Sequence, residues 1–247
     1  DRITLEEALG RFVYITDGRQ VFDKETVTVA KFQDFTDTYA ASIDYVYDSE
    51  NKLKRIPVSK AWLNSPKRQT VQAVTYKPSA NILTQNPEGI PSINLWRHRP
   101  LGKPNDNWQD LVRPFIDHIK WLWGEDSDVF LDWLAHIEQR PGELPHFGWL
   151  HIARHHGLGR NWISYVLTRV WSGHVAPAFD LIGTLQSGFN GRLSACHLAI
   201  VDEIYEGGSQ QWKHESALRQ LISADQRLIN PKFGHQRVEF NTTRFLM

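Results

Sequence analysis

Residues 147–161 read FGWLHIARHHGLGRN, an apolar run followed by a tight turn at Gly157-Leu158-Gly159. After the turn, apolar residues recur at helical intervals from Asn161 to Trp171. This order predicts a strand, a glycine turn and a helix, which together make half of a βαβ unit. Because such a turn places backbone N–H groups and the positive end of a helix around an anion, phosphate is the ligand that the segment suits.

The turn matches the phosphate-loop pattern G-x-x-x-x-G-K-[ST] only in part. Gly159 matches the second glycine, and Arg154 stands in place of the first. Arg160 replaces the lysine, and Asn161 replaces the hydroxyl residue. Arginine keeps the charge of lysine, but its planar guanidinium is longer and forks differently. Since a Gly-x-Gly-Arg turn also occurs in ordinary strand-to-helix connections, the turn alone leaves both interpretations open.

A second motif supplies the acidic half of the predicted site. Leu198–Val201 is an apolar run followed by Asp202 and Glu203, which is typical of a buried parallel strand with acids at its carboxyl end. In an ATP hydrolysis site one carboxylate holds hydrated Mg²⁺, and its neighbour polarises the attacking water. The prediction therefore requires residues 157–160 and 202–203 to lie side by side at one edge of the sheet.

Composition limits the class of protein. The 247 residues are 41% hydrophobic and 12% aromatic, which is typical of a globular chain. The 28 basic side chains balance the 28 acidic ones, so only a local patch could attract nucleic acid. The single cysteine, Cys196, favours a reducing compartment, and the apolar runs are too short to span a membrane. Because the chain begins at Asp1 without a leader, we expect an internal piece of a longer polypeptide.

The pattern along the chain predicts three regions. Residues 1–105 form a mixed α/β region with a hairpin around 16–19, helices at 30–41 and 59–63, a strand at 71–76 and a long ordered loop at 81–107. Residues 106–142 form a helical connector with helices at 108–123 and 127–138. Residues 143–247 form a partial P-loop core, with a further helix at 211–222 and strands at 227–233 and 236–247.

Two other features allow alternative interpretations. Four histidines fall within residues 146–156, and a metal-dependent hydrolase is conceivable if His151 and His155 share a helical face. The pattern there favours a strand and a loop instead, and no carboxylate lies among these histidines. The tryptophans at 121, 123, 133, 162 and 171 are expected to fill a core, although exposed tryptophans could stack on bases.

Several short motifs give the chain a family resemblance. They are WLAH at 133–136, QRPG at 139–142, GLGR at 157–160, FNGRL at 189–193 and IVDE at 200–203. With these motifs, residues 131–247 resemble the superfamily 3 helicase domain of phage and plasmid primase-helicases. Upstream, VTYKP at 74–78 and INLW at 93–96 look like the region before that domain. The resemblance implies an α/β fold with a P-loop core of the AAA+ type and a parallel sheet.

The resemblance also implies roles for individual residues. Gly157, Leu158, Gly159 and Arg160 would line the triphosphate of ATP, and Arg160 would also act in catalysis. Asn161 and Asp202 would hold Mg²⁺, and Glu203 would act as the base. The strand expected at 244–247 precedes the family's polar sensor and arginine finger, both of which lie beyond Met247.

The family's partners and setting follow from the same resemblance. Its members form rings, usually hexamers, that move along single-stranded DNA, often behind a primase-polymerase domain of the same chain. Lys232 and Arg237 are the DNA contacts that this implies here. The setting is the cytoplasm of a bacterial host, with a phage, prophage or plasmid gene and no membrane partner. The alternative is an AAA+-like scaffold or DNA-binding assembly module that has lost ATP hydrolysis, since Arg160 and Asn161 depart from the pattern.

Overall fold

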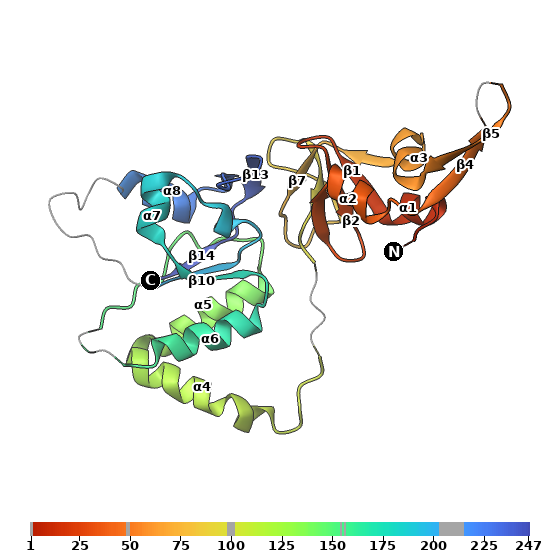
Figure 1. The fold of residues 1–247 in the computed structure, drawn as a ribbon. Helices are drawn as coiled ribbons and strands as arrows, with labels where there is room; N and C mark the ends of the chain where they lie inside the picture. Colours follow the sequence, from red (N-terminus) through yellow and green to blue (C-terminus); the bar gives the residue numbers. More distant parts are fainter. Residues whose placement is uncertain (1, 48–49, 98–101, 154, 156, 203–214) are drawn as a thin grey trace. The chain divides into compact units, whose positions relative to one another are not determined.

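The computed structural model describes residues 2–47, 50–97, 102–153, 155, 157–202 and 215–247 (Figure 1). The chain divides into two compact units. Asp1–Thr75 and Asn81–Leu95 form the first, which we call the N-terminal unit. Tyr76–Ala80 and Trp96–Met247 form the second, the core unit, so the helices predicted as a connector share a unit with the predicted P-loop core. In the part of the chain that the structure describes, no helix is both long and apolar enough to cross a bilayer.

The N-terminal unit is a mixed α/β structure. Its sheets have the strand orders β3-β2-β1-β6, β7-β9-β8 and β4-β5. Its elements are α1 (Leu5–Arg11), β1 (Phe12–Ile15), β2 (Gln20–Asp23), β3 (Thr28–Lys31), α2 (Phe32–Thr38), β4 (Ile43–Tyr47), β5 (Leu53–Pro57), α3 (Val58–Asn64), β6 (Gln69–Val71), β7 (Ala73–Thr75), β8 (Leu83–Gln85) and β9 (Pro91–Asn94).

The predicted hairpin and aromatic helix of this unit are confirmed. β1 and β2 pair antiparallel around residues 16–19. Phe35 of α2 packs edge-on against Phe12 of β1, with ring centroids 4.8 Å apart, and lies 5.1 Å from the ring of Trp62. These rings bury the face of α2 that helical spacing predicts to be apolar.

The prediction of a long loop at 81–107 is wrong for its first half, which contains β8 and β9. The proline and glycine residues there mark a tight turn. Asn86 accepts hydrogen bonds through Oδ1 from the backbone N–H groups of Glu88 and Ile90, both at 2.9 Å. Gly89 in the same turn has φ +78°, a conformation that favours glycine. Turn residues therefore connect two paired strands here.

The core unit is an α/β structure built on a parallel sheet. Its elements are α4 (Trp108–Trp123), a 3₁₀ turn η1 (Gly124–Asp126), α5 (Ser127–Gln139), α6 (Arg160–Val170), β10 (Val175–Phe179), α7 (Leu181–Ser187), a 3₁₀ turn η2 (Gly191–Leu193), β11 (Leu198–Val201), α8 (Glu215–Ser223), β12 (Gln226–Ile229), β13 (Arg237–Phe240) and β14 (Arg244–Leu246).

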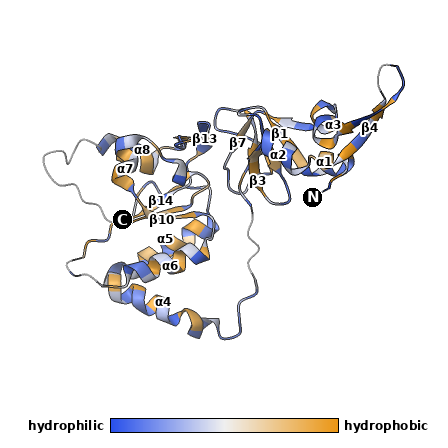
Figure 2. Cartoon of the chain, viewed as in Figure 1, coloured by the Kyte–Doolittle hydropathy of each residue, from blue (hydrophilic) through white to orange (hydrophobic). Residues whose placement is uncertain are grey.

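The sheet has the order β10-β11-β14, and every pair in it is parallel. Leu198 and Ile200 of β11 pack into a cluster with α4, α5 and α6, while Ala199 and Val201 pack into a second cluster with α7 and α8. Helices therefore cover both faces of the sheet (Figure 1), and hydrophobic residues lie along the strands and along α5 and α6 (Figure 2). The predicted fold class, an α/β core of the P-loop type with a parallel sheet, is confirmed.

The segment before the glycine turn continues this sheet. Trp149 bridges to Leu246 in parallel. Its backbone N–H donates to the carbonyl of Phe245 at 2.8 Å, and the N–H of His151 donates to that of Met247 at 2.7 Å. The chain that leads into the turn thus lies beside β14, but through an isolated bridge at Trp149 and not as the strand predicted for this segment.

Residues 236–247, predicted as one strand, form two. β13 pairs antiparallel with β12, whereas β14 joins the parallel sheet. Asn241 separates them, because its side-chain amide donates to the carbonyls of Leu221 and Ala224 at 3.1 Å and 2.9 Å. Carbonyls in the last turn of α8 and directly after it are satisfied in this way, and the chain turns into the sheet.

A buried polar cluster holds residues 76–80 within the core unit. The Tyr76 hydroxyl lies 3.1 Å from Nδ1 of His174 and 2.8 Å from Nε2 of His197. Nδ1 of His174 also lies 3.0 Å from the carbonyl of Ala195, so this nitrogen carries the hydrogen. Tyr76 then donates to Nε2 of His197, which is a neutral acceptor.

Acidification is expected to destabilise the core unit through His197. Burial, with the nearby His174 and Arg244, lowers the pKa of His197 from 6.5 to about 3. Between these values the unfolded chain binds a proton that the folded protein does not, so the free energy of unfolding falls as the pH falls from about 6.5 toward 3. The slope is up to ~1.4 kcal/mol per pH unit.

Urea denaturation at a series of pH values measures this slope. His197→Asn, which removes the titrating group and keeps an amide acceptor for Tyr76, is expected to flatten the profile over this window. The matched control His235→Asn changes an exposed histidine and is expected to retain the wild-type slope. Equal slopes in the wild type and His197→Asn would contradict the assignment.

Candidate nucleotide site

The glycine turn has the backbone that its sequence predicts. Gly157 and Gly159 have φ values of +78° and +80°, in the left-handed region. Gly159 is the N-cap of α6 and has no side chain that could cap the helix. A Cβ atom at Gly159 would lie 2.6 Å from Nε2 of His118, so glycine is needed here for both conformation and space. No N-cap side chain therefore accepts a hydrogen bond from the backbone N–H groups at the start of α6.

Arg160 joins the turn to the acidic end of β11. It is the first residue of α6, and its guanidinium donates a hydrogen bond to the carbonyl of Val201, the last residue of β11. Asp202 follows immediately and is exposed. The two motifs thus lie at the same edge of the sheet, as the sequence predicts. Glu203 lies outside the described residues.

His151 borders this edge from the neighbouring segment. Burial and the Arg160 guanidinium lower the pKa of His151. The Arg160 guanidinium thus places a positive charge near the turn, which suits an anionic ligand. The histidine cluster does not form the helical face considered above, because residues 150–153 are not helical. Within the described residues, no group of three or more potential metal ligands is present; Arg154 and His156 lie outside them.

Asn161 and Asp202 offer the oxygen ligands that Mg²⁺ prefers. Both side chains are exposed, Asn161 on the first turn of α6 and Asp202 after β11. An amide oxygen and a carboxylate are ligand types that a hydrated divalent cation accepts beside phosphate oxygens. The residue types are thus compatible with Mg²⁺ and ATP.

A group of aromatic side chains adjoins the turn, and the prediction that Trp121 and Trp162 fill the core is wrong. Trp121 is 64% exposed and Trp162 is 41% exposed, whereas Trp133 and Trp171 are buried as predicted. Helical periodicity gives the spacing of the apolar side chains on α4 and α6, but it does not show which neighbouring element covers each position. Trp162 lies two positions after Arg160, so its proximity to the turn could have been read from the sequence.

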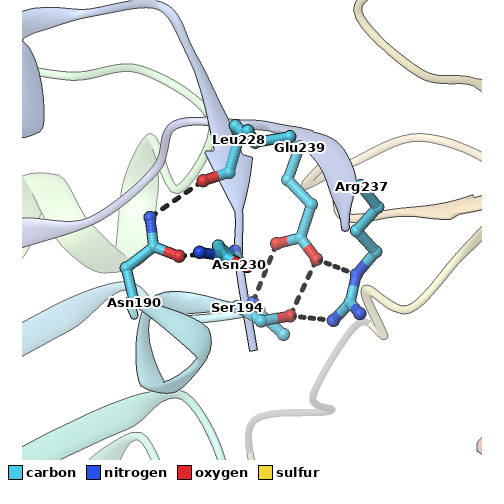
Figure 3. Close-up of polar contacts among 7 residues, drawn as sticks. Asn190, Ser194, Leu228, Asn230, Arg237 and Glu239 are labelled. Atoms are coloured by element: carbon cyan, nitrogen blue, oxygen red, sulfur yellow. Dashed lines mark hydrogen bonds and ion pairs between the residues drawn. The ribbon is translucent and has the colours of Figure 1, made fainter. Parts of the chain in front are cut away.

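The predicted DNA contacts differ in their surroundings. Arg237 belongs to a structural network: its Nε donates to the buried Glu239 carboxylate at 2.7 Å and its Nη2 to the Ser194 hydroxyl at 2.6 Å (Figure 3). Lys232 lies between β12 and β13, with its ammonium 5.4 Å from the ring centroid of Phe233. Phe233 is 93% exposed. Exposed basic and aromatic groups therefore occur together at Lys232 and Phe233, while Arg237 is engaged within the fold.

The side-chain network also fixes the base of this β12–β13 hairpin. The Asn190 amide donates to the carbonyl of Leu228 at 2.8 Å and accepts from the N–H of Asn230 at 2.7 Å (Figure 3). Ser194 donates to Glu239 at 2.7 Å. The hairpin is thus anchored on the 3₁₀ turn η2, which carries part of the FNGRL motif.

Comparison with known proteins finds similar structures but no matching sequence family. No protein-family model matches the chain, and no curated protein matches its sequence. Solved apo structures of the C-terminal region of NrS-1 share its fold. One has a TM-score of 0.69 at 18% identity and covers 95% of this chain and 52% of that chain. A second has a TM-score of 0.66 at 17% identity with the same coverage, 95% and 52%. This chain therefore spans about half the length of those structures, and its α/β fold is similar to that of the part it covers.

Proposed function

We propose that this chain is the nucleotide-binding part of an ATP-driven DNA helicase that acts in the replication of a phage or other mobile element. One observation carries the proposal. The Arg160 guanidinium donates a hydrogen bond to the carbonyl of Val201, the residue directly before Asp202. A glycine turn, a helix N-terminus, a guanidinium and a carboxylate therefore converge at one sheet edge. The likeness in fold to the NrS-1 C-terminal region agrees with the α/β core that this function needs.

Each residue would have a separate role. Backbone N–H groups of residues 157–161 would donate to the β- and γ-phosphates, aided by the positive end of α6. Arg160 has five N–H donors, so it could bind a phosphate oxygen and keep its bond to Val201. Asp202 and Asn161 would hold Mg²⁺, which neutralises charge on the phosphate oxygens when bound. Glu203 would accept a proton from the attacking water.

Single-stranded DNA would contact the β12–β13 hairpin. Lys232 offers a charge for phosphate, and the exposed ring of Phe233 beside it offers a face for a base. As in the family that the sequence resembles, the longer protein would form a homo-oligomeric ring, most simply a hexamer, and carry a primase-polymerase domain. Its site of action would be the cytoplasm of a bacterial host.

A scaffold without turnover is the second candidate function. It is favoured by the bond between Arg160 and Val201, since a guanidinium already engaged with the protein can stabilise the fold in the absence of nucleotide. Such a protein would bind nucleotide for assembly and would not hydrolyse it.

Magnesium-dependent ATP hydrolysis tests the helicase proposal. Glu203→Gln is expected to lower the turnover of the longer parent protein by ~10²–10⁴-fold, the contribution of a general base, and to leave ATP binding in place. Single-stranded DNA is expected to stimulate the wild type. The control Glu206→Gln makes the same change in the same segment and is expected to retain activity. Equal turnover in Glu203→Gln and the wild type would contradict the role of Glu203, and nucleotide binding without any turnover would favour the scaffold.

A further inference from the structure

An aromatic cluster from two helices contacts the glycine turn. The His118 ring of α4 lies against Gly159, where a Cβ would meet its Nε2 at 2.6 Å. The same ring stacks on Trp121, with centroids 5.6 Å apart and planes at 20°. Trp162 of α6 meets His118 edge-on at 5.3 Å and 86°, and Phe115 lies 6.0 Å from Trp162. The rings therefore form one surface that continues from the turn.

Core packing does not explain this surface. The stacked rings of Trp123 and Phe130, only 4.0 Å apart, belong to the core under the sheet. Trp121 and Trp162 belong to neither core cluster of the unit and are 64% and 41% exposed. Among the described residues, Nε2 of His118 has no hydrogen-bond partner. Two exposed tryptophans that contact the same histidine beside the turn are thus available to a ligand.

The position of the cluster beside the turn indicates which class of ligand it would bind. A ligand that binds both the turn and the rings needs an anionic part for the turn and a flat aromatic part for the rings. A nucleotide has both, in its phosphates and its base. The π-face of an aromatic side chain stacks on every base, so this recognition does not depend on base-specific hydrogen bonds. A purine covers more of an indole ring than a pyrimidine does.

We propose that Trp121, supported by the stacked His118 ring, forms a stacking platform for the base of the nucleoside triphosphate bound at residues 157–160. The inference rests on the proposed function, because it takes the phosphates to lie on the glycine turn. The platform accepts adenine and guanine alike and binds pyrimidine nucleotides more weakly. Trp162 borders the platform edge-on and shields one side of the base.

Isothermal titration calorimetry with two ligands tests the platform in the full chain. Magnesium–ATP carries a base, and magnesium–tripolyphosphate carries only the phosphates. Trp121→Ala is expected to weaken ATP binding by about 5- to 100-fold, the effect of losing one stacking ring, and to leave tripolyphosphate binding unchanged. Trp121→Phe is expected to retain most of the affinity. The control Trp108→Ala removes an exposed tryptophan at the other end of α4 and is expected to bind both ligands as the wild type does.

The outcomes separate this inference from the function on which it rests. If Trp121→Ala and His118→Ala bind ATP as tightly as the wild type, the platform is wrong although the phosphate site stands. If the wild type binds neither ligand, both proposals fail. If Trp121→Ala weakens binding of a single-stranded oligonucleotide and not of ATP, the rings serve DNA and the inference is overturned. Circular dichroism of each variant shows that the fold is retained.

Discussion

Arg160→Ala is expected to weaken the binding of magnesium–ATP by ~10- to 150-fold. The substitution removes a charge and a donor at the turn, and charge-assisted hydrogen bonds contribute ~1.5–3 kcal/mol each. It also breaks the bond to the Val201 carbonyl, which ties the turn to the end of β11. Calorimetric titration of the chain with magnesium–ATP measures the loss.

Two further variants serve as controls for the effect of Arg160→Ala. Arg160→Lys keeps the charge and restores the usual residue of the phosphate loop, so its affinity is expected to stay within ~10-fold of the wild type. Arg169→Ala removes an exposed arginine from the last turn of the same helix and is expected to change nothing. If Arg160→Ala binds magnesium–ATP as the wild type does, the turn is not a phosphate site.

Arg244→Met is expected to destabilise the core unit by ~3–5 kcal/mol. Arg244 lies in β14 and is 1% exposed. Its guanidinium donates to several backbone carbonyls, which belong to Arg140, Pro141, Glu143 and Thr242. Methionine fills a similar volume but satisfies none of these acceptors, and each buried carbonyl left unpaired costs ~1–3 kcal/mol.

Urea denaturation followed by tryptophan fluorescence measures this effect. The control Arg192→Met removes an exposed arginine that also donates to two carbonyls, those of Pro177 and Ala178. Water can replace these contacts, so a loss below ~1 kcal/mol is expected. Equal losses in the two variants would mean that burial of Arg244 does not determine its contribution.

Parts of the sheet with continuous apolar sequence were predictable. β11 reads Leu-Ala-Ile-Val and is buried on both faces, the pattern of an inner parallel strand. β10 lacks such a pattern because it contains Pro177 and is irregular, with a register shift between Ala176 and Phe179 and a positive φ of 45° at Ala178. Proline in a strand argues against that assignment from sequence alone, and only pairing with β11 overrides it.

The candidate site was also predictable from the sequence only in part. The glycine turn and Asp202 were predictable because short motifs determine local backbone and strand ends. The contact between His118 and Gly159 was not, since these residues are distant in sequence and meet only when α4 packs beside α6. The exposure of Trp121 follows from the same packing. Local pattern therefore predicts the backbone of the glycine turn, and tertiary packing decides which side chains surround it.

A crystal structure of the chain with magnesium and a non-hydrolysable ATP analogue tests the nucleotide site most directly. We expect the β- and γ-phosphates within hydrogen-bonding distance of the backbone N–H groups of residues 157–161, with the metal on the Asp202 side. The analogue bound elsewhere, for example in the cavity of about 520 Å³ lined by Ser79, Arg97 and His174, would contradict the proposed site.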